Sequence, residues 1–273
     1  MRTIVIGDIH GDCHGLMAIL RATGALDPQD RRAPDTRVIQ LGDLIHGAGP
    51  RSVPYAGIDD VEALRLGAKY CDEILIGNHE LPHLYEASNF PRFGGMRALS
   101  GPGYRALYGA RDAGKLRAAT AHDGWLLTHA GVHVALFAGY GGLGRSAEET
   151  AVLINEWYTE RLDTVLPLTL FDGIGYLRGG DYPQGGIFWC DWRELTADGV
   201  VSPIPQVVGH SPQEDGPVRH GNLWCVDVGA PLSGRVAALV QPEVGADWVP
   251  MVVTLVDEQG GTLVDQMRGS GHA

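Results

Sequence analysis

The chain has 273 residues, of which 44% are hydrophobic and 20% charged, and its formal net charge is −12 at pH 7. That length allows one large domain or two modest ones with a sizeable core. The negative charge argues against a generic nucleic-acid binder or a membrane-surface protein, because both need a broad basic field. The 39 glycines follow no three-residue period and alternate with apolar runs, which excludes collagen and disorder and favours a densely turned α/β protein.

Cysteine usage and hydropathy indicate a soluble protein of a reducing compartment. The four cysteines form no CxxC pair, so we expect free buried thiols and a cytoplasmic location. The first residues show no signal peptide. The longest apolar run, about 134–144, is shorter than the ~18 residues that span a bilayer.

The first half of the chain alternates strand-like and helix-like segments. Short apolar runs predict strands buried on both faces at 3–7, 37–41 and 73–77. Helical periodicity predicts helices over 14–23 and 59–70 and another from about residue 81. This β-α-β-α-β alternation predicts a mostly parallel sheet covered by helices.

The second half is less regular. Residues 90–122 have weak apolar periodicity and many Gly, Pro and Arg residues, so we expect an inserted helical cap or a long ordered loop there. A strand at 124–128 and the longest amphipathic helix, 148–165, follow, and 169–195 is loop-rich and aromatic. Late strands are expected at 205–209, 222–228, 236–241, 250–257 and 262–267. Because short turns join them, we expect antiparallel pairing.

Polar residues follow five of the predicted strands at the point where each strand ends. They are Asp8 and His10, Asp43, Asn78, His129 and His210. Ligands of open α/β sheets bind outside the carboxyl ends of the strands. A donor set of carboxylate, imidazole and amide oxygen without thiolate suits Mn, Fe or Zn. Six groups exceed one catalytic site, so two metals about 3.5–4 Å apart that share a carboxylate fit the count.

In this order, the motifs resemble those of the calcineurin-like metallophosphoesterases. The matching blocks are GDIHG from Gly7, GD from Gly42, GNHE from Gly77, HAG from His129 and GHSP from Gly209. GNHE in place of GNHD, and no second His in GHSP, resemble the phosphoprotein-phosphatase branch and its bacterial relatives. The segment FWCDW at 188–192 also looks like the LWSDP-type loop of protein phosphatases.

The resemblance implies a fold. We expect a metallophosphoesterase-type β-sandwich flanked by helices in α-β-β-α layers, α/β in class. It would form a single domain over 1–268, with the cap at 90–122 and a frayed tail at 269–273.

The resemblance also implies residue roles, carried over by position. Asp8 and His10 would hold the first metal, Asp43 would bridge both, and Asn78, His129 and His210 would complete the second site. His79 would be the general acid that protonates the leaving oxygen, oriented by the carbonyl or side chain of Glu80.

One motif departs from the family pattern GDxxDRG, because residues 42–47 read GDLIHG. His46 replaces the Asp that pairs with the general acid, and Gly47 replaces the Arg that binds phosphate. We therefore expect a differently tuned acid or a substrate with a better leaving group. His46 is either a local histidine or a functional replacement, and Arg51 or Arg178 could contact the phosphate. The remaining histidines expected to be solvated or locally bonded are His14, His83, His122 and His133.

The predicted function is hydrolysis of phosphoesters by a water that two metal ions activate, with Mn favoured and Fe or Zn as alternatives. A phosphomonoesterase acting on a protein or metabolite is the first expectation. A symmetrical dinucleoside-polyphosphate hydrolase or a phosphodiesterase is the second. A degenerate phosphate-binding protein is the alternative without activity. The partner in each case is a phosphorylated protein, nucleotide or metabolite, and the oligomeric state stays open.

Overall fold

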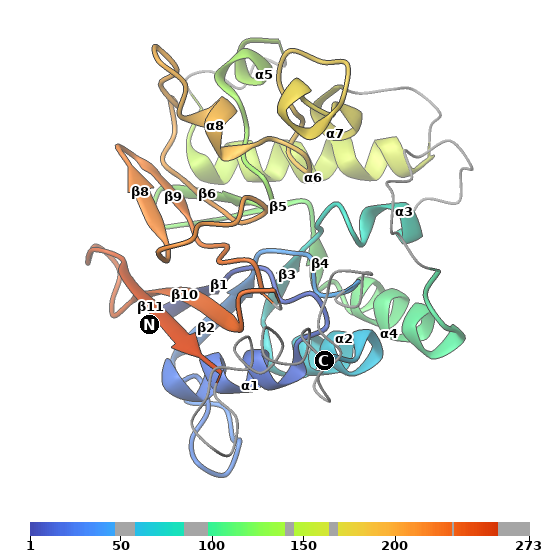
Figure 1. Ribbon diagram of the computed structural model, residues 1–273, viewed down its shortest axis with the longest axis vertical. Helices are drawn as coiled ribbons and strands as arrows, with labels where there is room; N and C mark the ends of the chain where they lie inside the picture. The colour runs from blue at the N-terminus through green and yellow to red at the C-terminus, as the bar shows by residue number, and fades with distance from the viewer. Residues whose placement is uncertain (47–57, 85–97, 140–144, 164–168, 231, 256–273) are drawn as a thin grey trace, which may run out of the picture.

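The computed structural model describes residues 1–46, 58–84, 98–139, 145–163, 169–230 and 232–255. Two β-sheets lie face to face, and helices cover the outer side of each sheet (Figure 1). This confirms the α-β-β-α layering that the motif resemblance implies.

The first sheet has six strands in the order β11-β10-β1-β2-β3-β4. These are β1 (Arg2–Ile6), β2 (Thr36–Gln40), β3 (Glu73–Leu75), β4 (Leu116–Arg117), β10 (Arg235–Gln241) and β11 (Val249–Thr254). Strands β1 to β4 are parallel, as predicted for the first three, and β10 pairs antiparallel with both β1 and β11. Parallel neighbours need crossover connections, which helices α1 (Cys13–Ala22) and α2 (Asp60–Tyr70) supply.

The second sheet has five strands in the order β5-β6-β7-β9-β8. These are β5 (Ala119–His122), β6 (Trp125–Thr128), β7 (Gln206–Val208), β8 (Val218–His220) and β9 (Leu223–Cys225). The three central strands β6, β7 and β9 are parallel, and β5 and β8 pair antiparallel at the two edges.

The remaining helices complete the two outer layers. They are α3 (Leu81–Leu84), α4 (Gly101–Asp112), α5 (Val134–Gly139), α6 (Ala147–Asp163), α7 (Thr169–Asp172), the 3₁₀ turn η1 (Tyr176–Arg178) and α8 (Trp192–Leu195). Helix α4 packs beside α2 on the side of the first sheet, and α6 packs on β5 and β6.

The core explains why the early strands are apolar throughout. On β1, Ile4 and Ile6 are fully buried in the cluster that includes Leu16 and Ile19 of α1. Val5 points to the opposite face, where it joins Leu127 and other residues of the second sheet between the two layers. A strand covered on both faces has no solvent side, so alternation of polar and apolar residues disappears.

The segment 90–122 differs from the expected cap. Residues 85–97 lie outside the described part, but 101–112 form α4 and the residues after it enter both sheets. β4 is an edge strand of the first sheet and β5 of the second. Strands of two and four residues are too short to show a hydrophobic period, which is why the sequence pattern predicts a loop here.

The pairing of the late strands differs in part from the predicted antiparallel arrangement. β7 and β9 are parallel rather than antiparallel, because β8 lies between them in the chain and reverses the direction once more. The strand predicted at 250–257 is β11, which pairs with β10. The predicted strand at 262–267 lies outside the described residues.

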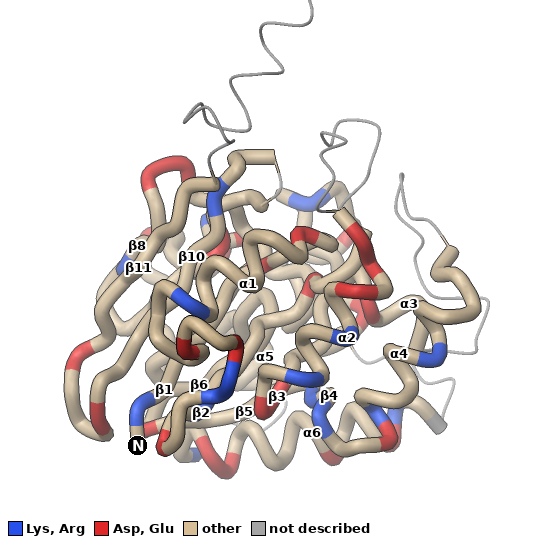
Figure 2. The backbone as a smooth tube through the Cα atoms, turned by 90° about the horizontal axis from the view of Figure 1, so that it is seen from below, with Lys and Arg blue, Asp and Glu red and all other residues tan. Residues whose placement is uncertain are grey.

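Two further expectations concern the environment of the chain. The four cysteines are free and buried, as predicted. Within the described residues, no helix combines the length and the apolar character needed to cross a membrane. In Figure 2, which views the molecule from the side of α1 and α2, basic positions are scattered among acidic ones.

Candidate metal centre and active site

The six predicted ligands come together where the strands of the two sheets end. Asp8 and His10 follow β1, Asp43 follows β2, Asn78 follows β3, His129 follows β6 and His210 follows β7. All six are buried except His10, which is half-buried. The strand ends of the two sheets meet at one edge of the sandwich, so the backbone N–H of His210, which follows β7, donates to the carboxylate of Asp8, 202 residues away, at 3.1 Å.

Asp43 stands at the centre of the site. Its Oδ2 atom lies 3.7 Å from Nε2 of His10, 3.8 Å from Nε2 of His79 and 3.4 Å from Nε2 of His129. Two groups of three side chains share this carboxylate, with ligand atoms within 4.8 Å of one another: His10, Asp43 and His79, and Asp43, His129 and His210. A carboxylate common to two such groups is the arrangement that a pair of ions needs.

Backbone contacts fix the histidine rings in the tautomer that metals require. Nδ1 of His129 lies 2.8 Å from the carbonyl of Leu41, and Nδ1 of His10 lies 3.1 Å from that of Ile45. A carbonyl only accepts, so each Nδ1 carries the proton and donates it. The Nε2 atoms of both rings therefore face the site, and a partner that orients a metal-binding imidazole in this way is common.

His210 gives an independent test of the donor set. Its Nε2 atom is buried and makes no hydrogen bond to any described residue. An unsatisfied buried nitrogen of this kind costs free energy unless a ligand binds it. Nδ1 of His210 lies 3.1 Å from Nε2 of His129, and Oδ1 of Asn78 lies 2.9 Å from the same Nε2. These nitrogen and oxygen donors fit Mn, Fe or Zn.

The charges of the site also point to a cation. Asp8, Asp43 and Asp227 are all buried together. Burial, followed by the charge of Asp227, raises the pKa of Asp8. Burial works against ionisation of Asp43, but the neighbouring histidines, His129 first, outweigh it and hold its pKa well below the usual range. Buried carboxylates that repel one another are stabilised when a metal ion neutralises them.

The side chain of Glu80 joins two loops of the site, and within the described residues no hydrogen bond from it to the His79 ring is present. It accepts backbone N–H groups of Gly77 and Asp43 at 2.9 Å and of Leu44 at 2.8 Å. Glu80 therefore ties the loop after β2 to the loop after β3 and holds Asp43 in place.

His79 and His46 lie against each other, as a partner of the general acid would. Nδ1 of His79 is 3.1 Å from Nδ1 of His46, and Nε2 of His79 faces Asp43. Burial lowers the pKa of His79 to about 3 despite the charge of Asp43.

Of the two arginines expected to contact a phosphate, only Arg178 lies within the described residues. Arg51 lies outside the described residues. Arg178 lies beside His210: its Nη2 donates to the His210 carbonyl at 3.0 Å and to Oγ of Ser211 at 2.9 Å. Its Nε pairs with Asp191 at 3.0 Å. Arg178 thus supports the loop that carries His210.

Sequence reasoning missed two residues of the site. Asp227 follows β9, whose parallel direction was not predicted, and its charge acts on Asp8. His83, expected to be solvated or bonded locally, is buried and contacts His46, 37 residues away in the chain. A carboxylate two residues after an apolar strand was a usable signal for Asp227, whereas nothing local marked His83.

A comparison with models of protein families shows which family the chain belongs to. The model of the calcineurin-like phosphoesterase family matches residues 1–224. The chain belongs to this family. The family is metal-dependent, and the described part of the chain holds two groups of His and Asp side chains that could bind metal ions. A comparison with curated proteins gave no significant match.

Solved structures show the same fold as this calcineurin-like phosphoesterase. A cold-active protein tyrosine phosphatase of a psychrophilic Shewanella species has a TM-score of 0.59 and 16% identity, covering 93% of this chain and 80% of that one. Another structure of a cold-active protein tyrosine phosphatase has a TM-score of 0.58 and 14% identity, covering 96% and 80%. At these identities the likeness is one of fold.

Proposed function

We propose that the chain is a phosphomonoesterase that works with two metal ions. The observation that supports this most directly is the position of Asp43, whose Oδ2 atom lies 3.7 Å from Nε2 of His10 and 3.4 Å from Nε2 of His129, a histidine of each proposed metal site. Asp8 and His10 would hold one ion, Asn78, His129 and His210 the other, and Asp43 both. Two ions of Mn, Fe or Zn would supply Lewis-acid activation of the attacking water and of the phosphoryl oxygens.

The residues around the ions would orient the substrate and supply a proton. Nε2 of His79 lies 3.8 Å from the shared carboxylate, so it would be close to a phosphoester that the two ions hold. His79 would donate a proton to that oxygen as a general acid. Arg178 is 25% exposed in its side chain, and its Nη1 atom, which binds no described residue, could contact a phosphate oxygen.

A monoester is the proposed substrate class, in a protein or a metabolite. The solved structures of the same fold are named protein tyrosine phosphatases, and phosphotyrosine is a monoester. His46 and Gly47 in place of the usual Asp and Arg are the features that favour the second candidate, a diester or a dinucleoside polyphosphate.

The test compares Mn-dependent hydrolysis of p-nitrophenyl phosphate with that of its bis-ester, with a chelator as control. We expect the monoester to be preferred and chelation to abolish turnover. His129→Ala and Asp43→Asn should lower turnover by at least ~100-fold and reduce the bound metal, because each removes a proposed ligand. The matched control His220→Ala removes an exposed histidine of β8 and should change neither.

Other outcomes would assign the site differently. Preference for the bis-ester would replace the monoesterase by a diesterase or a dinucleoside-polyphosphate hydrolase. Bound metal and bound phosphate without turnover of either ester would favour a degenerate phosphate-binding protein. Full activity with intact metal in His129→Ala would rule out the ligand assignment itself.

A further inference from the structure

The loop between α7 and α8 exposes several apolar side chains to solvent. Eleven large hydrophobic residues in the described part of the chain are exposed, and three of them fall between positions 176 and 182. They are Tyr176, Leu177 and Tyr182, with 62%, 47% and 38% of their surface exposed. Single exposed apolar residues need no explanation, but a group of them marks a contact surface. We call these three residues the apolar rim.

The apolar rim borders the proposed active site through Arg178, the next residue in the chain after Leu177. Nη2 of Arg178 donates to the backbone carbonyl of His210 at 3.0 Å and to Oγ of Ser211 at 2.9 Å. His210 is one of the proposed metal ligands. The turn that carries the apolar rim therefore lies directly outside the place where the proposed function puts the phosphate.

The geometry of the turn sets the directions of its side chains. Residues 176–178 form the 3₁₀ turn η1, in which consecutive side chains are about 120° apart. Since Arg178 reaches inward to His210, Tyr176 and Leu177 leave the turn on its two other sides. Tyr182 joins them through the backbone, because the N–H of Tyr176 donates to its carbonyl at 3.0 Å. The apolar groups thus flank the arginine without covering it.

Close packing of glycines holds the loop in one conformation. A Cβ atom on Gly175 would overlap the carboxylate of Glu194, which is 8% exposed. A Cβ atom on Gly180 would overlap the carbonyl of Ile174. The N–H of Gly180 also donates to the carbonyl of Gly175 at 3.0 Å. A surface fixed in this way loses little conformational entropy when a partner covers it.

The chemistry of the apolar rim fits a protein segment. Aromatic residues are enriched and acidic residues depleted at the centres of protein interfaces, and two of the three rim residues are tyrosines. The phosphate itself would bind at the metal site, so groups beyond the phosphate have to cover the rim. A peptide places side chains on both sides of its phosphorylated residue. The net charge of −12 opposes acidic groups at those positions, whereas apolar groups gain contact.

We propose that the apolar rim binds the residues next to the phosphorylated residue of a protein substrate and selects apolar neighbours there. This rests on the proposed phosphomonoesterase function and names its substrate class. The phosphate would lie at the metal site beside Arg178, and the neighbouring side chains would pack on Tyr176, Leu177 and Tyr182.

The first test uses pairs of phosphopeptides of equal length. The two members of a pair differ only in the neighbours of the phosphorylated residue, which are leucine in one and serine in the other. One pair carries phosphotyrosine and a second pair carries phosphoserine. With the full chain and Mn, the leucine peptide of a hydrolysed pair should have a KM about 5- to 10-fold lower, because an apolar side chain leaves water. Its kcat should be similar to that of the serine peptide, since this contact is the same before and during the reaction.

Variants of the turn locate the preference. Tyr176→Ser combined with Leu177→Ser should give both peptides of a pair the same KM. Tyr176→Phe keeps the ring and should keep the preference. Val152→Ser is the matched control, because Val152 is 58% exposed on α6, which carries none of the proposed site residues, and its preference should equal that of the wild type.

The outcomes separate the apolar rim from the proposed function. Equal KM values for both wild-type pairs, or a lost preference in Val152→Ser, would overturn the rim. Turnover of p-nitrophenyl phosphate without turnover of any peptide would overturn the protein substrate and favour a metabolite. An equal loss on p-nitrophenyl phosphate in the double variant would indicate damage to the site and would also overturn the rim. A wild type that turns over no ester would instead overturn the proposed function.

The second test does not depend on turnover. A difluoromethylphosphonate in place of the phosphate ester of the phosphotyrosine peptides is not hydrolysed, so titration calorimetry gives Kd directly. The leucine peptide should bind the wild type about 5- to 10-fold more tightly than the serine peptide. The double variant should bind both peptides equally. Equal Kd values in the wild type would overturn the rim even if no ester is hydrolysed.

Discussion

At the residue scale, the site is built on backbone conformations that few side chains adopt. Of the seven non-glycine residues with left-handed φ in the described part, four belong to the site: His10 (49°), Asp43 (55°), His46 (66°) and His210 (66°). Such conformations cost roughly 1–3 kcal/mol each, so they persist only where the surroundings impose them. Glu80 imposes one of them, since its carboxylate accepts the N–H groups of Asp43 and Leu44.

Close approach of the loops after β2 and β3 depends on glycine. A Cβ atom on Gly77 would overlap the backbone and carboxylate of Asp43. A Cβ atom on Gly42, whose φ is 101°, would lie 2.7 Å from the Gly77 nitrogen. The two glycines therefore let Asp43 reach the position that two ions would share.

Gly77→Ala should displace Asp43 and lower the metal content of the purified protein. Overpacking at such a site costs about 1–3 kcal/mol of unfolding free energy. Gly109→Ala is a matched control inside α4, where an added Cβ meets nothing within 4 Å. It should instead raise the unfolding free energy by about 0.5–1 kcal/mol. Metal analysis and urea unfolding measure both, and unchanged metal in Gly77→Ala would contradict the role given to this loop contact.

The residues of the site differ in how far the sequence could predict them. Asp8, Asp43 and His129 follow apolar strands directly, so a local pattern is enough to locate them. The task of Glu80 and the contact of His83 with His46 depend on which loops meet in space. A side chain that acts on residues 36 or 37 positions away has no local signature.

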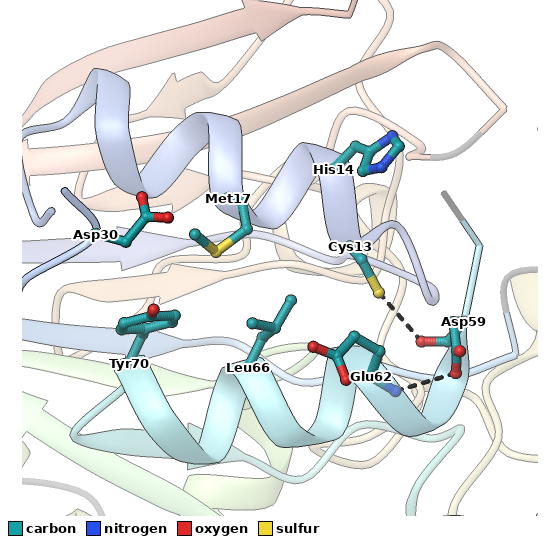
Figure 3. Close-up of a pocket in the computed structure, with 8 residues that line it drawn as sticks. All are labelled: Cys13, His14, Met17, Asp30, Asp59, Glu62, Leu66 and Tyr70. Carbon is teal, nitrogen blue, oxygen red and sulfur yellow. Dashed lines mark hydrogen bonds between the residues drawn. The ribbon is translucent and has the colours of Figure 1, made fainter. Parts of the chain in front are cut away.

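At the scale of elements, helix α2 connects the surface to the site. Its N-cap Asp59 accepts the N–H groups of Val61 at 2.9 Å and of Glu62 at 3.0 Å. The next residue, Asp60, accepts the N–H of His46. Figure 3 shows Asp59 at one end of a groove of about 410 Å³ between α1 and α2, lined by apolar and acidic side chains.

Asp59→Ala should lower the unfolding free energy by about 1 kcal/mol, because two N–H groups of the first turn lose their acceptor. It should also loosen the start of α2, where Asp60 holds His46. Asp30→Asn is the matched control: Asp30 lines the same groove, its carboxylate forms an ion pair with the exposed Arg21, and Asn tolerates the left-handed φ of 57° at this position. A surface ion pair contributes little, so the control should unfold as the wild type does. Equal unfolding of both variants would contradict the capping role.

Long periodic elements were predictable, whereas several short ones were not. The strands at β1 and β2 and helices α1, α2 and α6 lie near their predicted positions, because each buries an apolar face with a clear period. The short elements β3, β7 and α3 also lie near predicted positions. The unpredicted helices α5, α7 and α8 have at most six residues, and the unpredicted strands β4 and β8 have two or three. Segments that short are defined by their neighbours in space.

At the scale of the whole molecule, a polar contact between β5 and β10 joins the two sheets. His122 of β5 in the second sheet contacts Gln241 of β10 in the first, with 2.6 Å between Nε2 and Oε1. Gln241 also donates to Asp123 at 2.7 Å, and the His122 ring packs edge-on against Trp248 at 5.9 Å between centroids. This polar contact closes the sandwich where its apolar interior ends.

The contact between His122 and Gln241 should make the unfolding free energy depend on pH. Burial lowers the pKa of His122 below 6.5, its ordinary value. Above pH 6.5 the ring is neutral in both the folded and the unfolded chain, so its contribution is fully present. As the pH falls below 6.5, the unfolded chain binds the proton first, and the unfolding free energy decreases. His122→Gln keeps a hydrogen-bonding group but removes the titration, so its unfolding free energy should fall less than that of the wild type between pH 7 and pH 5.

Urea unfolding at both pH values, with chelator present, measures the two decreases, and His220→Gln on the exposed strand β8 controls for the loss of an imidazole. Equal decreases in the wild type and His122→Gln would show that the edge contact is not what makes the sandwich sensitive to acid.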